Sequence, residues 1–399
     1  MLATTAGGAG FLLEVGAVLL ALAVLARVAA RTGFSPIPFY LLAGLAIGFF
    51  APPDIDSGII VIESQIAVML LLFMLGVEYT AGDVVRSLHS GLGTGVADLV
   101  LNFPPGLLVG LALGWDALPA LLLGGVTYIS SSSIVAKVLD DLGRLGNSET
   151  PSVLSVLVIE DLVMAPYLPL VAVLLAGGSL LRGLALAFAA CGLAVVALVT
   201  AGRHGQLLSR RIAHPKSEVV LLTVVGLLMI AGGAAELIGV SAAVMAFLVG
   251  LALSGTLAHR ARELMSPLRD LFAAIFFVSF GLQIDVRSIP GVLGVAAILW
   301  AVTSGTKLLT GWLAARRVSA VPGRLRAGTA LIARGEFSIV IAGLGVAAGT
   351  ESRLAPLAAT YVLLTAVSGP LLTRYADGLG LRLVRRRARQ GSGAEAAEG

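Results

Sequence analysis

Charged residues are scarce in this chain. Only 13% of its 399 residues are Asp, Glu, Lys or Arg, whereas soluble domains carry about 25%. Hydrophobic residues make up 58% of the chain, and the mean hydropathy is +0.99. This composition excludes a soluble globular domain and predicts an all-α polytopic membrane protein. The formal charge of +4 comes from basic residues between apolar stretches, where they set orientation, so nucleic-acid binding is not predicted.

Cysteine is nearly absent as well. The single residue Cys191 excludes an intrachain disulfide, a multi-cysteine metal site and an iron–sulfur cluster. Glu160 and Asp161 are adjacent, so they do not form an aspartyl dyad, which takes carboxylates from two helices. A membrane Ser–His dyad is also excluded, because all four histidines fall between apolar stretches: His89, His204, His214 and His259. We therefore expect neither an enzyme nor a cofactor.

Apolar stretches long enough to cross a bilayer recur along the whole chain. We expect thirteen spans, near residues 11–30, 36–50, 59–79, 92–113, 117–138, 151–177, 181–201, 218–236, 238–254, 267–283, 289–314, 327–349 and 355–377. No basic region precedes the first span, so we expect it to be retained.

The basic residues predict the orientation of these spans. With the amino terminus outside, all but five of the 27 Lys and Arg residues lie on the inner side. Arg182, Arg287 and Arg353 lie outside, and Lys307 and Arg334 fall within spans. This bias favours an odd number of spans and a cytoplasmic carboxyl terminus in a cell membrane. Residues 379–399 hold a basic cluster and then Gly, Ala and Glu with nothing apolar to bury, which predicts a disordered tail.

Two spans have polar centres. Residues 127–133 (TYISSSS) interrupt the fifth span, and residues 334–338 (RGEFS) interrupt the twelfth. Backbone can unwind at membrane depth only where protein or water satisfies its amides, as at transporter binding sites. We therefore predict two broken, crossing helices. Spans 4–6 and 11–13 occupy corresponding places in two six-span halves, as in an inverted repeat, and the seventh span would link the halves.

The strongest functional clue is the acid pair Glu160 and Asp161 inside the sixth span, where charge is costly and usually functional. Neighbours on a helix point about 100° apart, so the two acids should have different roles. Asp161 is expected to bind an alkali cation and a proton in turn, and this competition couples their opposite movements. Glu160 is expected to pair with Lys307, either as a fixed ion pair or as one that opens and exchanges a proton.

Other polar residues are expected to support this site. Thr127, Ser131 and Ser132 could offer oxygen ligands to a dehydrated cation, although small residues also serve close helix packing. We expect the two charges Arg334 and Glu336 to neutralise each other and the helix ends at the break. Two further polar residues of the fourth span share one helix face and could line the cavity or brace the broken helix: Asp98 and Asn102.

Several segments resemble the monovalent cation:proton antiporters, and within them the Kef-like potassium/proton branch. Residues 71–78 (LLFMLGVE) resemble the LLF-x-x-G-x-E segment of that family, and residues 130–137 resemble its serine-rich broken helix. Residues 276–281 (FFVSFG) match its FFVSxG signature, and residues 334–337 match its RGEF element. Together these motifs are highly specific.

The resemblance implies a homodimer that works by an elevator motion. Its scaffold would comprise residues 1–91 and 218–284, its mobile core residues 92–180 and 285–378, and its linker residues 181–217. Gly44 and Gly48 in the second span form a small-residue ridge and a candidate dimer contact.

The resemblance also assigns residues. Asp161 corresponds to the ion-binding aspartate of the family and Lys307 to its core lysine. Relatives carry Asp, Asn or Gln where this chain has Glu160, so both the stoichiometry and the choice between Na⁺ and K⁺ stay open. The nucleotide-binding domain of many Kef-like proteins is absent here, which suggests a separate TrkA-type regulatory subunit. A sodium-coupled organic-solute carrier of similar architecture and a cation channel are the alternatives.

Overall fold

The computed structural model describes residues 2–32, 34–50, 57–78, 81–186, 188, 189, 192, 196, 215–237, 242–253 and 255–395. These residues form helices and connections without any β-strand, as the composition predicts. The first half contains α1 (Leu2–Thr32), α2 (Ile37–Phe50), α3 (Ser57–Glu78), α4 (Ala81–Ala112), α5 (Ala117–Tyr128), α6 (Ser132–Asp141) and α7 (Thr150–Leu175). The second contains α9 (Ser217–Leu237), α10 (Ala242–Ala252), α11 (Gly255–Leu282), η1 (Val286–Ser288), α12 (Ile289–Ala315), α13 (Val321–Ala330), α14 (Glu336–Ala347) and α15 (Leu354–Glu395).

Membrane-spanning length is reached by seven helical segments within the described ranges. They run over Gly91–Ala112, Ala117–Asp141, Thr150–Leu175, Ser217–Ala235, Leu257–Leu282, Val286–Ala315 and Leu354–Gly378. Shorter apolar helices cover Ile37–Phe50, Gln65–Met74 and Glu336–Ala347. The chain is thus a multi-pass, all-helical membrane protein. Most of the predicted seventh span, residues 181–201, lies outside the described residues, as does Cys191.

Both predicted helix breaks are present. The fifth span divides into α5 and α6 around residues 129–131, and the twelfth divides into α13 and α14 around residues 331–335. Ser131 ends the first break as the N-cap of α6, where its hydroxyl accepts a hydrogen bond from the amide of Ile134. Its own N–H donates to the carbonyl oxygen of Ala333 at 2.9 Å. The two breaks therefore meet.

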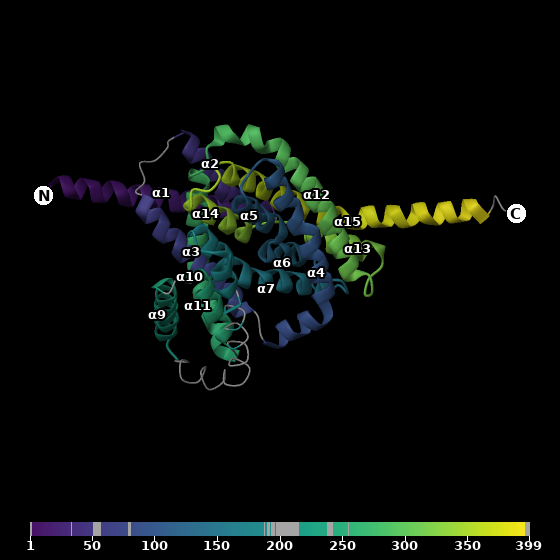
Figure 1. Cartoon of the computed structure of the whole chain (residues 1–399), viewed down its shortest axis with the longest axis horizontal. Coiled ribbons are helices and arrows are strands. Elements are labelled where there is room, and N and C mark those ends of the chain that lie inside the picture. The colour runs from purple at the N-terminus through teal and green to yellow at the C-terminus, as the bar shows by residue number, and fades with distance from the viewer. Residues whose placement is uncertain are drawn as a thin grey trace.

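The helices pack in two sets. In one, α3 lies against α10 and α11, while α2 lies against α11. In the other, α4 packs on α5, α7 and α12, and α12 packs on α13 and α15. The breaks lie within the second set, and the labels α5 and α6, which flank the first break, lie close together near the middle of Figure 1. In the same view α1 and the last part of α15 extend from opposite sides of the molecule.

Two expectations differ from the structure. Gly44 does not lie on a free ridge, because a Cβ there would come within 2.2 Å of the Val278 carbonyl oxygen and 2.9 Å of Gly281 Cα. This glycine brings α2 against α11 inside the chain, so the prediction of a dimer contact at Gly44 is wrong. The tail predicted to be disordered from residue 379 continues as helix α15 to Glu395. Leu and Arg, which favour helix, make up eight of residues 379–389.

Candidate functional site

The crossing of the breaks brings together polar residues that are far apart in the sequence. The sixth predicted span is one continuous helix, α7, and carries Glu160 and Asp161 at its middle. Glu160 is completely buried and Asp161 is 1% exposed. Since Asp161 follows Glu160 on a helix, the two acids face different neighbours, as predicted.

Glu160 faces α12. Its Oε1 lies 2.8 Å from Lys307 Nζ, so the predicted ion pair between these residues is present. Its Oε2 accepts a hydrogen bond from the backbone N–H of Ser130 at the first break. The Ser130 hydroxyl lies 3.1 Å from Glu160 Oε1 and 3.0 Å from the carbonyl oxygen of Leu331 in the second break. Ser130, which the sequence placed in the first break without predicting its contact with Glu160, therefore joins the acid of α7 to both breaks.

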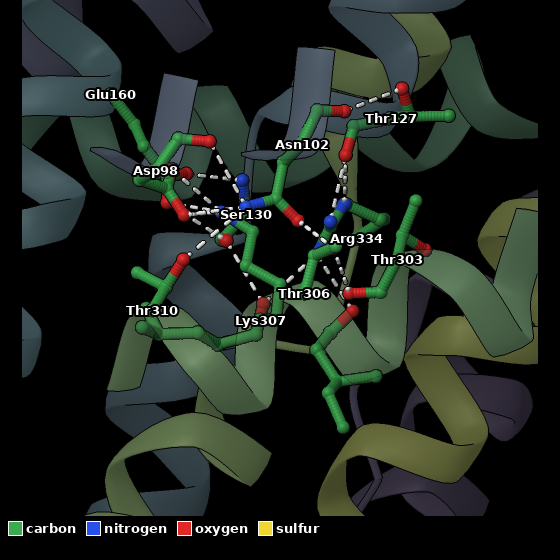
Figure 2. A network of polar contacts seen from close by, with 12 residues as sticks. Asp98, Asn102, Thr127, Ser130, Glu160, Thr303, Thr306, Lys307, Thr310 and Arg334 are labelled. Atoms are coloured by element: carbon green, nitrogen blue, oxygen red, sulfur yellow. Dashed lines mark hydrogen bonds and ion pairs between the residues drawn. The ribbon is translucent and has the colours of Figure 1, made fainter. Parts of the chain in front are cut away.

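Lys307 has a second acidic partner. Asp98 on α4 contacts Lys307 Nζ through both carboxylate oxygens, each at 2.8 Å. Figure 2 shows Asp98, Glu160 and Lys307 in one network of polar contacts. All three side chains are fully buried. The ring of Tyr128 lies beneath the ammonium group, with its centroid 5.7 Å from Nζ. One buried cation is thus shared by two buried carboxylates.

Asn102 lies one helical turn after Asp98. Of its two predicted roles, lining the cavity or bracing the broken helix, its contacts correspond to the second. Its amide nitrogen donates to Asp98 Oδ1 at 2.8 Å, and its amide oxygen accepts from Thr306 at 2.7 Å. Thr310 lies 3.3 Å from the same amide nitrogen. The carbonyl oxygen of Asn102 accepts from the hydroxyl of Thr127 at 3.0 Å. Asn102 therefore ties α4 to α12 and to the end of α5.

The four consecutive serines at the first break donate hydrogen bonds to three acids. Ser130 faces Glu160, as described above, and Ser132 donates to Asp161 Oδ2 at 3.3 Å. Ser131 and Ser133 both donate to Glu336 Oε2, at 3.0 and 3.2 Å. Among the predicted oxygen ligands, Ser132 places its hydroxyl against Asp161. The hydroxyl of Thr127 donates instead to backbone carbonyl oxygens, and that of Ser131 faces Glu336.

Arg334 and Glu336 do not pair with each other, so this part of the prediction is wrong. Arg334 is fully buried and donates to the carbonyl oxygens of Thr127, Leu331 and Ile332. These carbonyls end α5 and α13, where helix dipoles are negative. Glu336 begins α14 and contacts the serines that begin α6, and helix starts are positive. The two charges therefore compensate opposite helix ends.

A second charged cluster lies away from the breaks. Arg326 Nε contacts Glu149 at 2.5 Å, and Arg326 Nη1 contacts Asp377 at 2.5 Å. Arg144 also contacts Asp377, at 2.7 Å. Glu149 lies in the connection before α7. Burial alone would raise its pKa, but the hydrogen bonds from Arg326, Asn147 and the backbone, together with the positive charge of Arg326, outweigh burial. The pKa of Glu149 therefore lies below its usual value. The cluster ties that connection to α13 and α15.

Comparison with known proteins assigns the chain to a family. The family model described as "Sodium/hydrogen exchanger, transmembrane" matches residues 17–376. This chain belongs to that family. The members of this family are secondary transporters, not enzymes, and they share an antiporter fold.

Two relatives align over nearly their whole length. The K(+)/H(+) antiporter subunit KhtU of Bacillus subtilis is 36% identical, over 90% of this chain and 92% of its own. The ammonium/H(+) antiporter subunit AmhT of Alkalihalophilus pseudofirmus is 32% identical, over 95% and 96%. Among solved structures, the sodium proton antiporter MjNhaP1 from Methanocaldococcus jannaschii superimposes with a TM-score of 0.65. It covers 94% of this chain and 99% of its own at 18% identity, and so shows a shared fold.

Proposed function

We propose that this chain exchanges a monovalent cation, K⁺ or Na⁺, for protons across the membrane by alternating access. One observation carries the proposal: a buried acid pair lies where two interrupted helices meet, with Glu160 in contact with the buried lysine and Asp161 in contact with Ser132 at the start of α6. The names of the relatives support it, since KhtU is a K(+)/H(+) antiporter subunit. The cation and the proton are substrates, and we expect no cofactor.

Asp161 is the proposed carrier. Its neighbour Glu160 contacts Lys307, whereas Asp161 faces Ser132, whose side chain is partly exposed. A cation and a proton each neutralise one carboxylate, and a second positive charge at the same buried group is unfavourable. The two substrates therefore compete for Asp161 and move in turn. Hydroxyl and carbonyl oxygens at the first break, including those of Ser131 and Thr127, are candidates for completing an alkali-ion shell when the site rearranges.

The proposed architecture has about thirteen spans in an inverted repeat. Residues 1–91 and 218–284 would form the scaffold, residues 92–180 and 285–378 the moving core, and residues 181–217 the linker. The separate packing of α2 and α3 with α10 and α11, and of α4 with α5, α7 and α12, supports this division. An elevator movement of the core would carry Asp161 between the two sides.

The proposed assembly is a homodimer, with its amino terminus outside and its carboxyl terminus in the cytoplasm. The excess of Lys and Arg in alternate connections supports this orientation. KhtU and AmhT are both named as subunits, which supports a separate cytoplasmic regulatory partner of the TrkA type for this chain.

The test is a pH-jump assay in proteoliposomes. K⁺, Na⁺, Li⁺ and NH₄⁺ are supplied separately, ammonium because of the name of AmhT. The expected result is proton movement that requires K⁺ or Na⁺ and disappears in Asp161→Asn. Cation flux without proton movement would indicate a channel. Cation flux that depends on an added organic solute would indicate a sodium-coupled carrier. Exchange at the parental rate in Asp161→Asn would reject the role of that carboxylate.

A further inference from the structure

Lys307 contacts two acids that are anchored in different ways. Both carboxylate oxygens of Asp98 and one of Glu160 lie 2.8 Å from Nζ. Two negative charges around one positive charge exceed what an ion pair needs, and none of the three side chains is exposed. Because surplus charge inside a membrane is costly, the second acid calls for an explanation.

Asp98 is held by continuous helices. Its carboxylate accepts from Asn102 at 2.8 Å, and Asn102 in turn accepts from Thr306. Asp98 and Asn102 belong to α4, while Thr306 and Lys307 belong to α12. Asp98 and Asn102 lie one turn apart on α4, and their partners Lys307 and Thr306 are neighbours on α12; Figure 2 labels all four. Contact between Asp98 and Lys307 is therefore independent of the geometry of either break.

Glu160 is held by a break. Apart from Lys307, its partners are the backbone N–H and the hydroxyl of Ser130, which lie between α5 and α6. Ser132, two residues farther on, contacts Asp161. A cation that draws the serines of the break toward Asp161 would also disturb the partners of Glu160. Of the two acids on Lys307, Glu160 is the one that is coupled to the ion site.

We propose that Asp98 is a positioning residue that keeps Lys307 paired and fixed on α12 while Glu160 separates from Lys307 during each transport cycle. This inference rests on the proposed function. An ammonium group with no counterion is strongly unfavourable when it is fully buried. With Asp98 in place, Glu160 can leave without exposing such a charge to the membrane interior. Without Asp98, Glu160 is the one acid that the described residues still place on Lys307, and their separation becomes the difficult step.

The transport test uses Asp98→Asn, which keeps the shape of the side chain and removes its charge. Turnover is expected to fall at least about tenfold. The KM for the cation should rise by a smaller factor, because the lost interaction acts on the movement of the core and not on cation binding. The matched control is Asp141→Asn, whose acid lies at the surface and pairs with Lys137. Its turnover should stay within about twofold of the parent. Turnover of Asp98→Asn within that same range would overturn the proposal, and so would a loss confined to the KM.

A second measurement needs no transport. Melting temperatures in detergent are compared for Asp98→Asn, Lys307→Met and the double variant. In the parent, Asp98→Asn removes a partner of Lys307 and should lower the melting temperature. In the Lys307→Met background the same change removes an unpaired buried acid and should raise it. A lowered melting temperature in both backgrounds would assign Asp98 to packing alone and overturn the proposal.

The two measurements separate this inference from the proposed function. If the parent protein moves no protons in exchange for any cation, the proposed function fails, while the melting temperatures still report whether Asp98 acts through Lys307. If the parent exchanges cations and Asp98→Asn does so at the parental rate, the inference alone fails.

Discussion

Arg334 holds the carbonyl oxygen of Thr127 with two N–H groups, Nε at 3.1 Å and Nη2 at 2.7 Å. Thr127 lies in the last turn of α5, and Arg334 lies in the break between α13 and α14. The remaining guanidinium nitrogen, Nη1, donates to Leu331 and Ile332, each at 2.9 Å. One buried side chain thus satisfies carbonyls from both interrupted helices, which water would otherwise have to reach at membrane depth.

Replacing Arg334 should therefore damage both breaks. Each hydrogen bond to a charged group contributes about 1.5–3 kcal/mol. Because Arg334→Gln removes several of these bonds, we expect it to lower the free energy of unfolding by several times that amount and to abolish exchange. Arg334→Lys should be intermediate, because an ammonium group keeps the charge but lacks the planar fork. Melting in detergent and the proteoliposome assay provide the measurements. The control is Arg353→Gln, at an exposed position. Equal losses of melting temperature and exchange in Arg334→Gln and Arg353→Gln would refute this explanation.

Gly335 offers a steric test of the same crossing. A Cβ at this position would come within 2.4 Å of Ser131 Oγ and 2.7 Å of Ser131 Cβ. Gly335→Ala should push the breaks apart and lower stability by about 1–3 kcal/mol, as overpacking does, with a marked loss of exchange. Gly343→Ala is the matched control, because its nearest neighbour, on the ring of Phe280, would lie 3.8 Å away. Comparable melting temperatures for the two alanine variants would contradict the close contact of the breaks.

The sequence was informative wherever polar residues interrupted an apolar span. Serines in the fifth span and the RGEF segment in the twelfth predicted both breaks, because few other arrangements accommodate such residues in a membrane. The ion pair of Glu160 and Lys307 followed from the same reasoning, since each buried charge requires a partner. These predictions depend on the cost of burying charge and not on the details of packing.

The partners of the remaining residues depended on the three-dimensional path of the chain. Asp98 had no identifiable partner in the sequence, and its contact with Lys307 spans 209 positions. The separation of Arg334 from Glu336 arises because each side chain turns toward helix ends of the opposite sign, which spacing alone does not reveal. Likewise, the glycine ridge at Gly44 is typical of both dimer contacts and internal packing, and only the position of α11 decides between them.

The cluster around Arg326 predicts an acid-sensitive contribution to stability. The pKa of Glu149 is lowered in the folded protein, so its interaction stabilises the fold above the usual pKa of about 4.3. That contribution should be lost as the pH falls through the lower, folded-state pKa. We expect Glu149→Gln to melt below the parent at pH 7 and the difference to shrink toward pH 3. A difference that stays constant over this range would show that the charge of Glu149 is not responsible.

Close packing of α2 on α11 gives a graded prediction for the first set of helices. A Cβ at Gly44 would come within 2.2 Å of a backbone oxygen, whereas one at Gly48 would lie 3.0 Å from the Leu282 carbonyl oxygen. Backbone atoms cannot turn aside, so Gly44→Ala must separate the helices, and we expect a loss of about 1–3 kcal/mol. Gly48→Ala requires only a small shift and should lose less, and Gly16→Ala, with nothing within 4 Å, should lose least. The three melting temperatures should therefore rise in the order Gly44→Ala, Gly48→Ala, Gly16→Ala. If Gly44→Ala melted at the parental temperature, the contact between α2 and α11 would have to be looser than the structure describes.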